Sequence, residues 1–325
     1  MSCCSSKSSS GGGGGNGCAL TLAAVAAGGA IAGIALAHLW QPATCRKGKK
    51  KASGGVCPFS GKKSSKFDAK GVHLKYWGGR GLMETGRMLL AIGGFFPQDG
   101  DYVDGRYTTD VATGVEDGPR KRAAYNDIKD TLASNLGRMP VCATPAGDVG
   151  QSAAINYYLA TELGLMGAGA LEGATIVSIQ EHLKEMGQAY RKLVPYGKEP
   201  SAEANDQWFD GGAEDASPAP ADMKNRDRFL KWYAGRIEAV VGGGGFAVGA
   251  SISLADVLLF RAFGECLSDA QATDTVKPWS KEPFGSKART DKVLAGTPKL
   301  RAIIAQVAAN PGVARWLAER GVQGF

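Results

Sequence analysis

The sequence predicts an α/β domain over residues 71–165 followed by an all-helical domain over residues 166–325, both behind an N-terminal extension. Three observations indicate this organisation. Between residues 74 and 165 short apolar runs alternate with a helical pattern, whereas from about residue 169 the apolar residues recur at helical spacing. The first 70 residues are rich in serine, glycine, alanine and lysine, and residues 1–17 have nothing to bury. A chain of 325 residues with 44% hydrophobic residues is long enough for two such domains.

The positive charge of the chain is concentrated in the extension. Ten basic residues and one acidic residue precede residue 71, so a formal charge of +7 for the chain leaves about −2 for the folded region. Proteins that bind nucleic acid need a basic surface on the folded domain. We therefore expect no nucleic-acid partner.

The cysteines and histidines do not have the spacing of a metal site. The sequence contains no CxxC pair, and its three histidines are far apart. Five cysteines precede the folded region, which itself contains only Cys142 and Cys266. We expect neither a structural zinc ion nor a disulfide framework.

The extension divides into three segments. Residues 1–17 are predicted to be disordered, residues 18–40 form an uncharged stretch, and residues 41–70 form a basic linker. At about 1.5 Å per residue, a helix over residues 18–40 is long enough to cross a membrane core of roughly 30 Å. The basic cluster at residues 46–51 would stay on the cytosolic side of the membrane, and the folded domains that follow it would then lie in the cytosol. A membrane anchor is the leading interpretation.

Two alternatives for the extension stay open. Residues 35–37, Ala-Leu-Ala, have the small-x-small form of a signal-peptide cleavage site. A serine-rich start without acidic residues is also typical of leaders that target an organelle and are removed there. In either case the segment would be cleaved and would not anchor the mature protein.

The α/β domain begins with a strand that ends at residues 74–77, "LKYW", and continues with a helix over residues 81–92. A second strand is predicted within residues 101–107, and a third directly after Pro140, where a cis peptide bond fits the tight bend. After a turn at residues 145–147, a helix begins at Gln151. Its unpaired N–H groups and positive dipole end predict a binding site for a carboxylate.

Three motifs in this domain resemble one family. Tyr76 with its Gly/Arg-rich turn, "RMPV" at 138–141 and "GQSAAINYYLA" at 150–160 are similar to the N-terminal domain of cytosolic glutathione transferases. The resemblance is greatest to the sigma class, which includes glutathione-dependent prostaglandin D synthase. It implies a thioredoxin-like fold for residues 71–165 and a substrate-binding role for the helical domain. It also implies glutathione as the co-substrate and a homodimer.

The resemblance makes Tyr76 the candidate catalytic residue. In tyrosine-type members of the family, the hydroxyl at the end of the first strand donates a hydrogen bond to the sulfur of glutathione. A thiol with a pKa of about 8.5 is only a few per cent ionised at neutral pH. Lowering that pKa by about two units requires roughly 2.7 kcal/mol, and a hydrogen bond to a charged group supplies about 1.5–3 kcal/mol. One tyrosine hydroxyl is therefore close to sufficient.

The resemblance also implies which residues hold glutathione. Backbone groups of Met139, before Pro140, would bind the cysteinyl part of the tripeptide. Gln151 and Ser152 would bind its γ-glutamyl carboxylate at the helix start.

Further glutathione contacts follow from spacing shared with the family. Tyr125 and Lys129 match an aromatic-x-x-x-lysine pattern that holds the glycyl carboxylate, and Arg138 stands where lysine or glutamine is common. On the helix after residue 169, Glu185 falls where an acidic residue approaches the neighbouring subunit's glutathione.

One position departs from the family pattern. An arginine usually stands six residues after the tyrosine and supports its hydroxyl, whereas this chain has Leu82 there. The nearest arginine is Arg80. The hypothesis is that Arg80 or a bound water takes over this support, or that the activity is weak.

The helical domain has three readable features. Residues 171–194 carry an apolar stripe at Ile176, Ile179, Leu183, Met186 and Tyr190, which predicts a helix packed on a core. Residues 198–222 form an acidic, proline-rich insertion predicted to lie exposed. Ser253 and Asp256 form a capping-box variant, also found in the family, before another helix.

Together these observations predict a glutathione transferase that ionises the thiol with Tyr76 and conjugates it to a small hydrophobic electrophile, the chemistry of detoxification. No metal is expected. Two alternatives remain: a glutathione-dependent isomerase, in which the thiolate adds and later leaves, and a non-catalytic binding or structural protein with the same fold.

Overall fold

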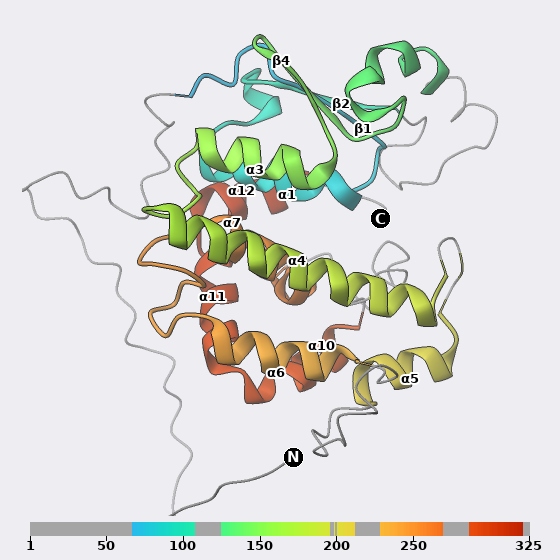
Figure 1. The fold of residues 1–325 in the computed structure, drawn as a ribbon, viewed down its shortest axis with the longest axis vertical. Coiled ribbons are helices and arrows are strands. Elements are labelled where there is room, and N and C mark those ends of the chain that lie inside the picture. The colour runs from blue at the N-terminus through green and yellow to red at the C-terminus, as the bar shows by residue number, and fades with distance from the viewer. Residues whose placement is uncertain are drawn as a thin grey trace, which may run out of the picture. The chain divides into compact units, whose positions relative to one another are not determined.

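The computed structural model describes residues 67–107, 125–195, 198, 200–211, 228–268 and 286–320. The predicted disordered segment, the predicted anchor and all but the last residues of the linker lie outside the described residues. Among the helices that are described, none combines the length and the apolar character needed to span a membrane. The described residues form the two predicted domains (Figure 1).

The N-terminal domain contains a four-stranded sheet in the order β2-β1-β3-β4. Its strands are β1 (His73–Tyr76), β2 (Val103–Arg106), β3 (Val141–Thr144) and β4 (Gly147–Gly150). β1 and β2 are parallel, while β3 pairs antiparallel with both β1 and β4. This mixed topology is thioredoxin-like, as predicted. The sequence analysis did not identify β4, because its Gly-Asp-Val-Gly sequence has the composition of a turn.

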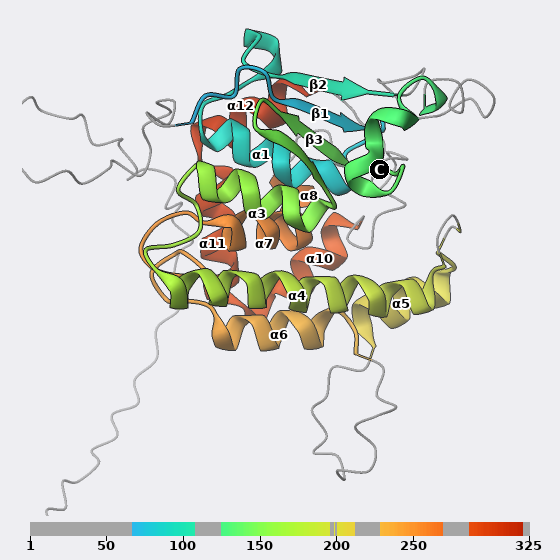
Figure 2. The same cartoon turned by 45° about the horizontal axis from the view of Figure 1, so that its top comes forward.

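Helices α1 (Glu84–Ile92) and α3 (Ser152–Glu162) lie together on one side of this sheet (Figure 2). α1 follows a short 3₁₀ turn, Gly81–Met83, and ends before Gly94, whose φ of 82° is left-handed. Two more 3₁₀ segments, Pro97–Asp99 and Lys129–Asn135, flank β2 and β3 in sequence. The crossover β1-α1-β2 joins the two parallel strands.

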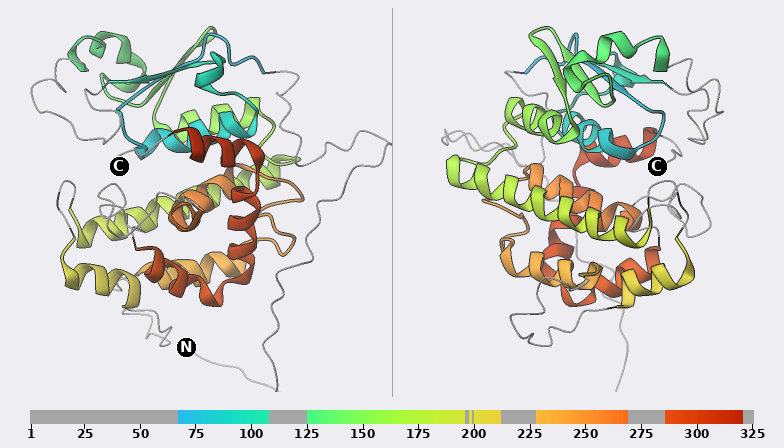
Figure 3. Two further views of the ribbon diagram at one scale, coloured as in Figure 1. Left: turned by 180° about the vertical axis from the view of Figure 1, so that it is seen from behind. Right: turned by 45° about the vertical axis from the view of Figure 1, so that its right-hand side comes forward.

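The C-terminal domain is helical (Figure 3). Its long helix is α4 (Ala170–Leu193), and a π-helical turn, Phe260–Gly264, joins α7 directly to α8. The remaining helices are α5 (Ala202–Asp210), α6 (Leu230–Val240), α7 (Leu254–Leu259), α8 (Glu265–Ser268), α10 (Lys287–Val293), α11 (Pro298–Ala308) and α12 (Pro311–Glu319), with a 3₁₀ turn at Leu294–Gly296.

Two predictions for this domain are confirmed. The apolar stripe of α4 is its inner face, where Ile176, Ile179, Met186 and Tyr190 are buried. At the start of α7, Ser253 Oγ donates to Asp256 at 2.5 Å, and the same carboxylate accepts the Ser253 N–H at 2.8 Å. Burial raises the pKa of Asp256, against the opposing effect of these hydrogen bonds. The capping box therefore fixes the first turn of a helix that faces the N-terminal domain.

The prediction for residues 198–222 is partly wrong. Residues 202–210 form α5, and its Trp208 is completely buried while Phe209 is 4% exposed. Ser201 caps the helix by accepting the Ala204 N–H at 3.1 Å. The acidic composition of the segment gave no indication of this buried apolar turn. The turn packs against α4, where the Tyr190 and Trp208 rings meet edge to face.

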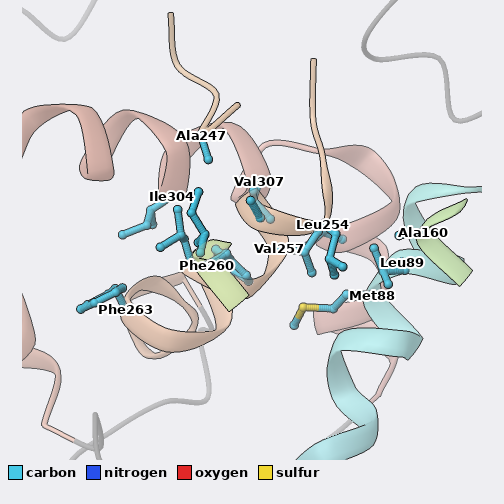
Figure 4. Packing of buried hydrophobic residues seen from close by; sticks show 14 of the residues in the cluster. Met88, Leu89, Ala160, Ala247, Leu254, Val257, Phe260, Phe263, Ile304 and Val307 are labelled. Atoms are coloured by element: carbon cyan, nitrogen blue, oxygen red, sulfur yellow. The ribbon is translucent and has the colours of Figure 1, made fainter. Parts of the chain in front are cut away.

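The two domains share one hydrophobic core. Figure 4 shows Met88 and Leu89 of α1 beside Leu254 and Val257 of α7. On another side of α1, helix α12 approaches so closely that a Cβ atom on Gly312 would lie 2.0 Å from the Ala91 carbonyl oxygen. Helix α1 of the N-terminal domain is therefore packed directly on the helical domain.

Candidate functional site

Tyr76 is the last residue of β1, and its side chain is 8% exposed. Its hydroxyl oxygen accepts a hydrogen bond from the Leu82 N–H at 3.0 Å. Gly81 lies against the hydroxyl: a Cβ atom there would stand 2.4 Å from the Tyr76 oxygen, and the φ of 38° also favours glycine. The turn after β1 thus wraps around the tyrosine hydroxyl.

Arginine side chains hold this turn through its backbone carbonyls. Arg87 Nη1 donates to the carbonyl oxygens of Gly79 at 2.9 Å and Arg80 at 3.3 Å. Arg261, from the helical domain, donates from Nη2 to the Gly81 carbonyl at 3.0 Å. The conformation of residues 79–82 therefore depends on both domains.

Two fully buried glutamates pair with these arginines. Glu84 contacts Arg87, Arg320 and the indole N–H of Trp316. Glu265 contacts three guanidinium groups, those of Arg80, Arg261 and Arg320.

The charge of both glutamates follows from this pairing. Burial by itself would raise their pKa values, but the surrounding arginines outweigh it, so the pKa of Glu84 is well below its usual range and that of Glu265 is lowered to about 2. The cluster is ionic at neutral pH and lies directly behind the tyrosine turn.

A cis peptide bond joins Met139 to Pro140, as predicted. The Asn135 side chain donates from Nδ2 to the Pro140 carbonyl at 2.9 Å, and Met139 is half-buried next to the core. This places the Met139 backbone at the entry of β3, beside β1 and its terminal tyrosine.

Gln151 and Ser152 stand at the N-terminus of α3. Gln151 has φ 68° and ψ 127°, a strained conformation for a residue with a side chain. Such backbone strain often accompanies binding sites. Within the described residues the Gln151 side chain makes no cap hydrogen bond, so the N–H groups of the first turn are left for a ligand or solvent. The geometry fits the predicted carboxylate site.

A cavity of about 370 Å³ lies between the domains. Gly81, Leu82 and Ser152 contribute to its wall from the N-terminal domain. The helical domain contributes apolar side chains, such as Leu183 and Leu258, and the polar or charged side chains of Gln180, Glu181, Lys184 and Arg261. Leu82 is 58% exposed and adds apolar surface beside the tyrosine turn. The turn that holds the Tyr76 hydroxyl and the helix start with Ser152 thus face one cavity.

The other predicted glutathione residues have mixed placements. The Tyr125 ring stacks on Trp77, next to Tyr76, with ring centroids 5.9 Å apart, and its hydroxyl donates to the Gly137 carbonyl. Arg138 Nε donates to the Asn135 carbonyl at 3.5 Å. Lys129 and Glu185 are exposed and do not belong to the cavity lining.

Arg80 lies elsewhere than the sequence hypothesis placed it. Its side chain is 1% exposed and donates to Glu265, while a backbone N–H, that of Leu82, donates to the tyrosine hydroxyl. The sequence analysis did not identify Arg261 or Glu265. Their separation by four residues on one helical face was the available signal, but nothing in it indicated contact with residue 81.

Comparison with known proteins shows what this chain is similar to. The family model described as "Glutathione S-transferase, C-terminal domain" matches residues 208–320. A Caenorhabditis elegans protein, probable glutathione S-transferase 5, is 23% identical over 78% of this chain and 98% of its own length. This chain is similar to the cytosolic-type glutathione S-transferases.

Solved structures show the same glutathione S-transferase fold. A nematode-specific enzyme of C. elegans superposes with a TM-score of 0.51 at 21% identity, covering 78% of this chain and 99% of its own. The monomeric Na-GST-3 of the hookworm Necator americanus gives a TM-score of 0.52 at 19% identity, with the same coverage of both chains. The predicted glutathione S-transferase relationship is confirmed, whereas the roles of individual residues stay predictions.

Proposed function

We propose that this protein is a glutathione transferase in which the Tyr76 hydroxyl stabilises the thiolate of bound glutathione. The carrying observation is that the turn around this hydroxyl and the start of α3 face one cavity. A tripeptide whose γ-glutamyl carboxylate lies on the α3 N-terminus can then extend its thiol toward Tyr76. The family relationship supports glutathione as the ligand.

The hydroxyl suits this role because it accepts a hydrogen bond from Leu82 N–H. A hydroxyl that accepts such a bond becomes a better donor through its own O–H. Donation to sulfur favours the thiolate over the thiol, and the released proton goes to solvent. The thiolate then attacks an electrophilic carbon: with an aryl halide, the sulfur–carbon bond forms and halide leaves.

The electrophile is proposed to occupy the apolar part of the cavity, which is built from side chains of both domains. Leu82, Leu183 and Leu258 offer apolar surface, while Glu181, Lys184 and Arg261 add charged groups at the wall. A small hydrophobic electrophile gains about 25 cal/mol per Å² of apolar surface removed from water. Its binding in this position would bring it beside the thiolate.

An assay of the purified full chain with glutathione and a chromogenic aryl halide tests the proposal. Turnover above the uncatalysed rate supports a transferase. Retention on immobilised glutathione without turnover of any electrophile in a panel would instead indicate the non-catalytic binding protein.

Ser152→Ala is expected to weaken glutathione binding by about tenfold, since a hydrogen bond to a charged carboxylate contributes about 1.5 kcal/mol. The effect should appear in the KM for glutathione and leave kcat within about twofold. Isothermal titration of glutathione provides the direct measurement. Thr161→Ala on the same helix is a control, because its hydroxyl bonds only the Tyr157 carbonyl within the helix among the described residues. Equal glutathione affinity of Ser152→Ala and wild type would show that Ser152 does not bind glutathione.

We further propose a homodimer, which would give the exposed Glu185 its function. On the outer side of α4 this carboxylate is available to the glutathione amino group of a neighbouring subunit. Tyr125, Lys129 and Arg138 are proposed to surround the glycyl carboxylate of the same ligand.

The membrane anchor is likewise proposed for residues 18–40, with the enzyme domains in the cytosol. Expressed in cells, the full chain is expected to resist extraction by alkaline carbonate, and a chain lacking residues 1–45 is expected to be released. Release of the full chain would instead indicate a cleaved leader or a soluble protein.

A further inference from the structure

We propose that Arg261 is a positioning residue for Tyr76, acting on its hydroxyl through a single peptide group. The inference rests on the proposed function and names a residue of the helical domain that tunes the thiol. It also links the wall of the electrophile cavity to thiol activation, since Arg261 belongs to both.

The peptide group between Gly81 and Leu82 is the connecting element. Its carbonyl oxygen accepts from Arg261 Nη2 at 3.0 Å, and its N–H donates to the Tyr76 hydroxyl at 3.0 Å. Because a peptide group is planar and rigid, fixing the carbonyl also fixes the direction of the N–H. Arg261 therefore sets the orientation of the N–H group that donates to the tyrosine hydroxyl.

The positive charge of Arg261 at the Gly81 carbonyl also makes the Leu82 N–H a stronger donor. Hydrogen bonds in series polarise one another, so a charged donor at the carbonyl makes the N–H on the other side a stronger donor. The tyrosine O–H becomes a stronger donor in turn, and its proposed acceptor is the thiolate of bound glutathione. Arg261 thus stabilises negative charge on sulfur without touching the ligand.

Arg261 is itself held rigidly. Its Nη1 pairs with Glu265 one helical turn later, and Glu265 is buried among the guanidinium groups of Arg80 and Arg320. The side chain of Arg261 is 15% exposed, so solvent screens the interaction little. A planar guanidinium can bond the carbonyl and the carboxylate from two nitrogens at once, whereas a lysine ammonium is a single point charge.

This arrangement supplies the support that the chain lacks at Leu82. The sequence suggested Arg80 for that role, but the Arg80 guanidinium donates to Glu265. Arg261 comes from 180 residues further along the chain and contacts the turn directly.

The test compares Arg261→Met and Arg261→Lys with wild type in the full chain. We measure the pH dependence of kcat/KM and of the ultraviolet thiolate absorbance of bound glutathione. Arg261→Met is expected to raise the midpoint of both profiles by about one pH unit and to lower kcat at neutral pH about tenfold. The KM for glutathione should change less than about twofold. The midpoints of Arg261→Lys should lie between those of wild type and of Arg261→Met.

Arg315→Met is the matched control. Arg315 also pairs with a glutamate four residues later, but it lies on the surface of α12 with its side chain 37% exposed. Its substitution should leave both midpoints unchanged. Thermal melting of each variant separates a loss of folding from a shift in the midpoint.

Unchanged midpoints in folded Arg261→Met overturn the inference, even if kcat falls. If that variant does not fold, the midpoint of Arg261→Lys decides in the same way. Wild-type protein that binds glutathione without turnover still permits the absorbance titration. Absence of any glutathione binding by the wild type overturns the proposed function, and the inference with it.

Discussion

Tyr76→Phe is expected to lower kcat/KM for glutathione conjugation by about 100-fold at neutral pH. The substitution keeps the aromatic ring in the core and removes only the hydroxyl. A hydrogen bond to a charged acceptor contributes about 1.5–3 kcal/mol, which corresponds to a 10- to 150-fold change in rate or ionisation. The bound thiol should then titrate near the ordinary thiol pKa of about 8.5.

The pH dependence of the conjugation rate is the most stringent test of this prediction. At a pH above the free-thiol pKa, glutathione ionises without help, so the difference between Tyr76→Phe and wild type should shrink as the pH rises. Tyr157→Phe on α3 is the matched control, since its ring is 52% exposed and it does not line the cavity. It should retain the wild-type rate. A Tyr76→Phe rate within twofold of wild type at pH 7 would show that another group activates the thiol.

The sequence predicted the elements whose signals are local. The helix start at Ser152, the strand after Pro140 and the capping box at Ser253 each depend on a few adjacent residues, and the structure has all three. The position of Tyr76 at the end of β1 could also be predicted. What could not be predicted was the partner of its hydroxyl, because that partner is a backbone N–H whose direction is set by tertiary contacts.

The buried ionic cluster was missed for a related reason. Glu84 and Arg320 are 236 residues apart, and each occurs in a helical segment where a charged residue would ordinarily be solvated. Composition alone also misassigned α5: its acidic surroundings concealed Trp208, whose burial is decided by the neighbouring α4. Long-range pairing of charged or aromatic side chains leaves no local pattern to read.

Glu84→Gln is expected to destabilise the protein by about 3–5 kcal/mol, the usual effect of breaking a buried ion pair from one side. Glu84 is fully buried and accepts hydrogen bonds from Arg87, Arg320 and Trp316. The amide keeps the shape but leaves two buried guanidinium groups without this counter-charge. The melting temperature should fall by roughly 10 °C. Glu319→Gln, which breaks an exposed pair with Arg315, should change stability by less than about 1 kcal/mol.

The same cluster predicts how stability depends on pH. The pKa values of Glu84 and Glu265 are lowered because the arginines outweigh burial, so the folded state binds fewer protons than the unfolded state in acid. Their stabilisation is complete above the unfolded glutamate pKa of about 4.3 and is lost as the pH falls toward the folded values. The free energy of unfolding, measured with denaturant from pH 7 to pH 3, should therefore fall steeply for wild type and less steeply for Glu84→Gln. Parallel curves for the two proteins would show that the pKa of Glu84 is the same in the folded and unfolded states, since only then does its replacement by an amide leave the difference in bound protons unchanged.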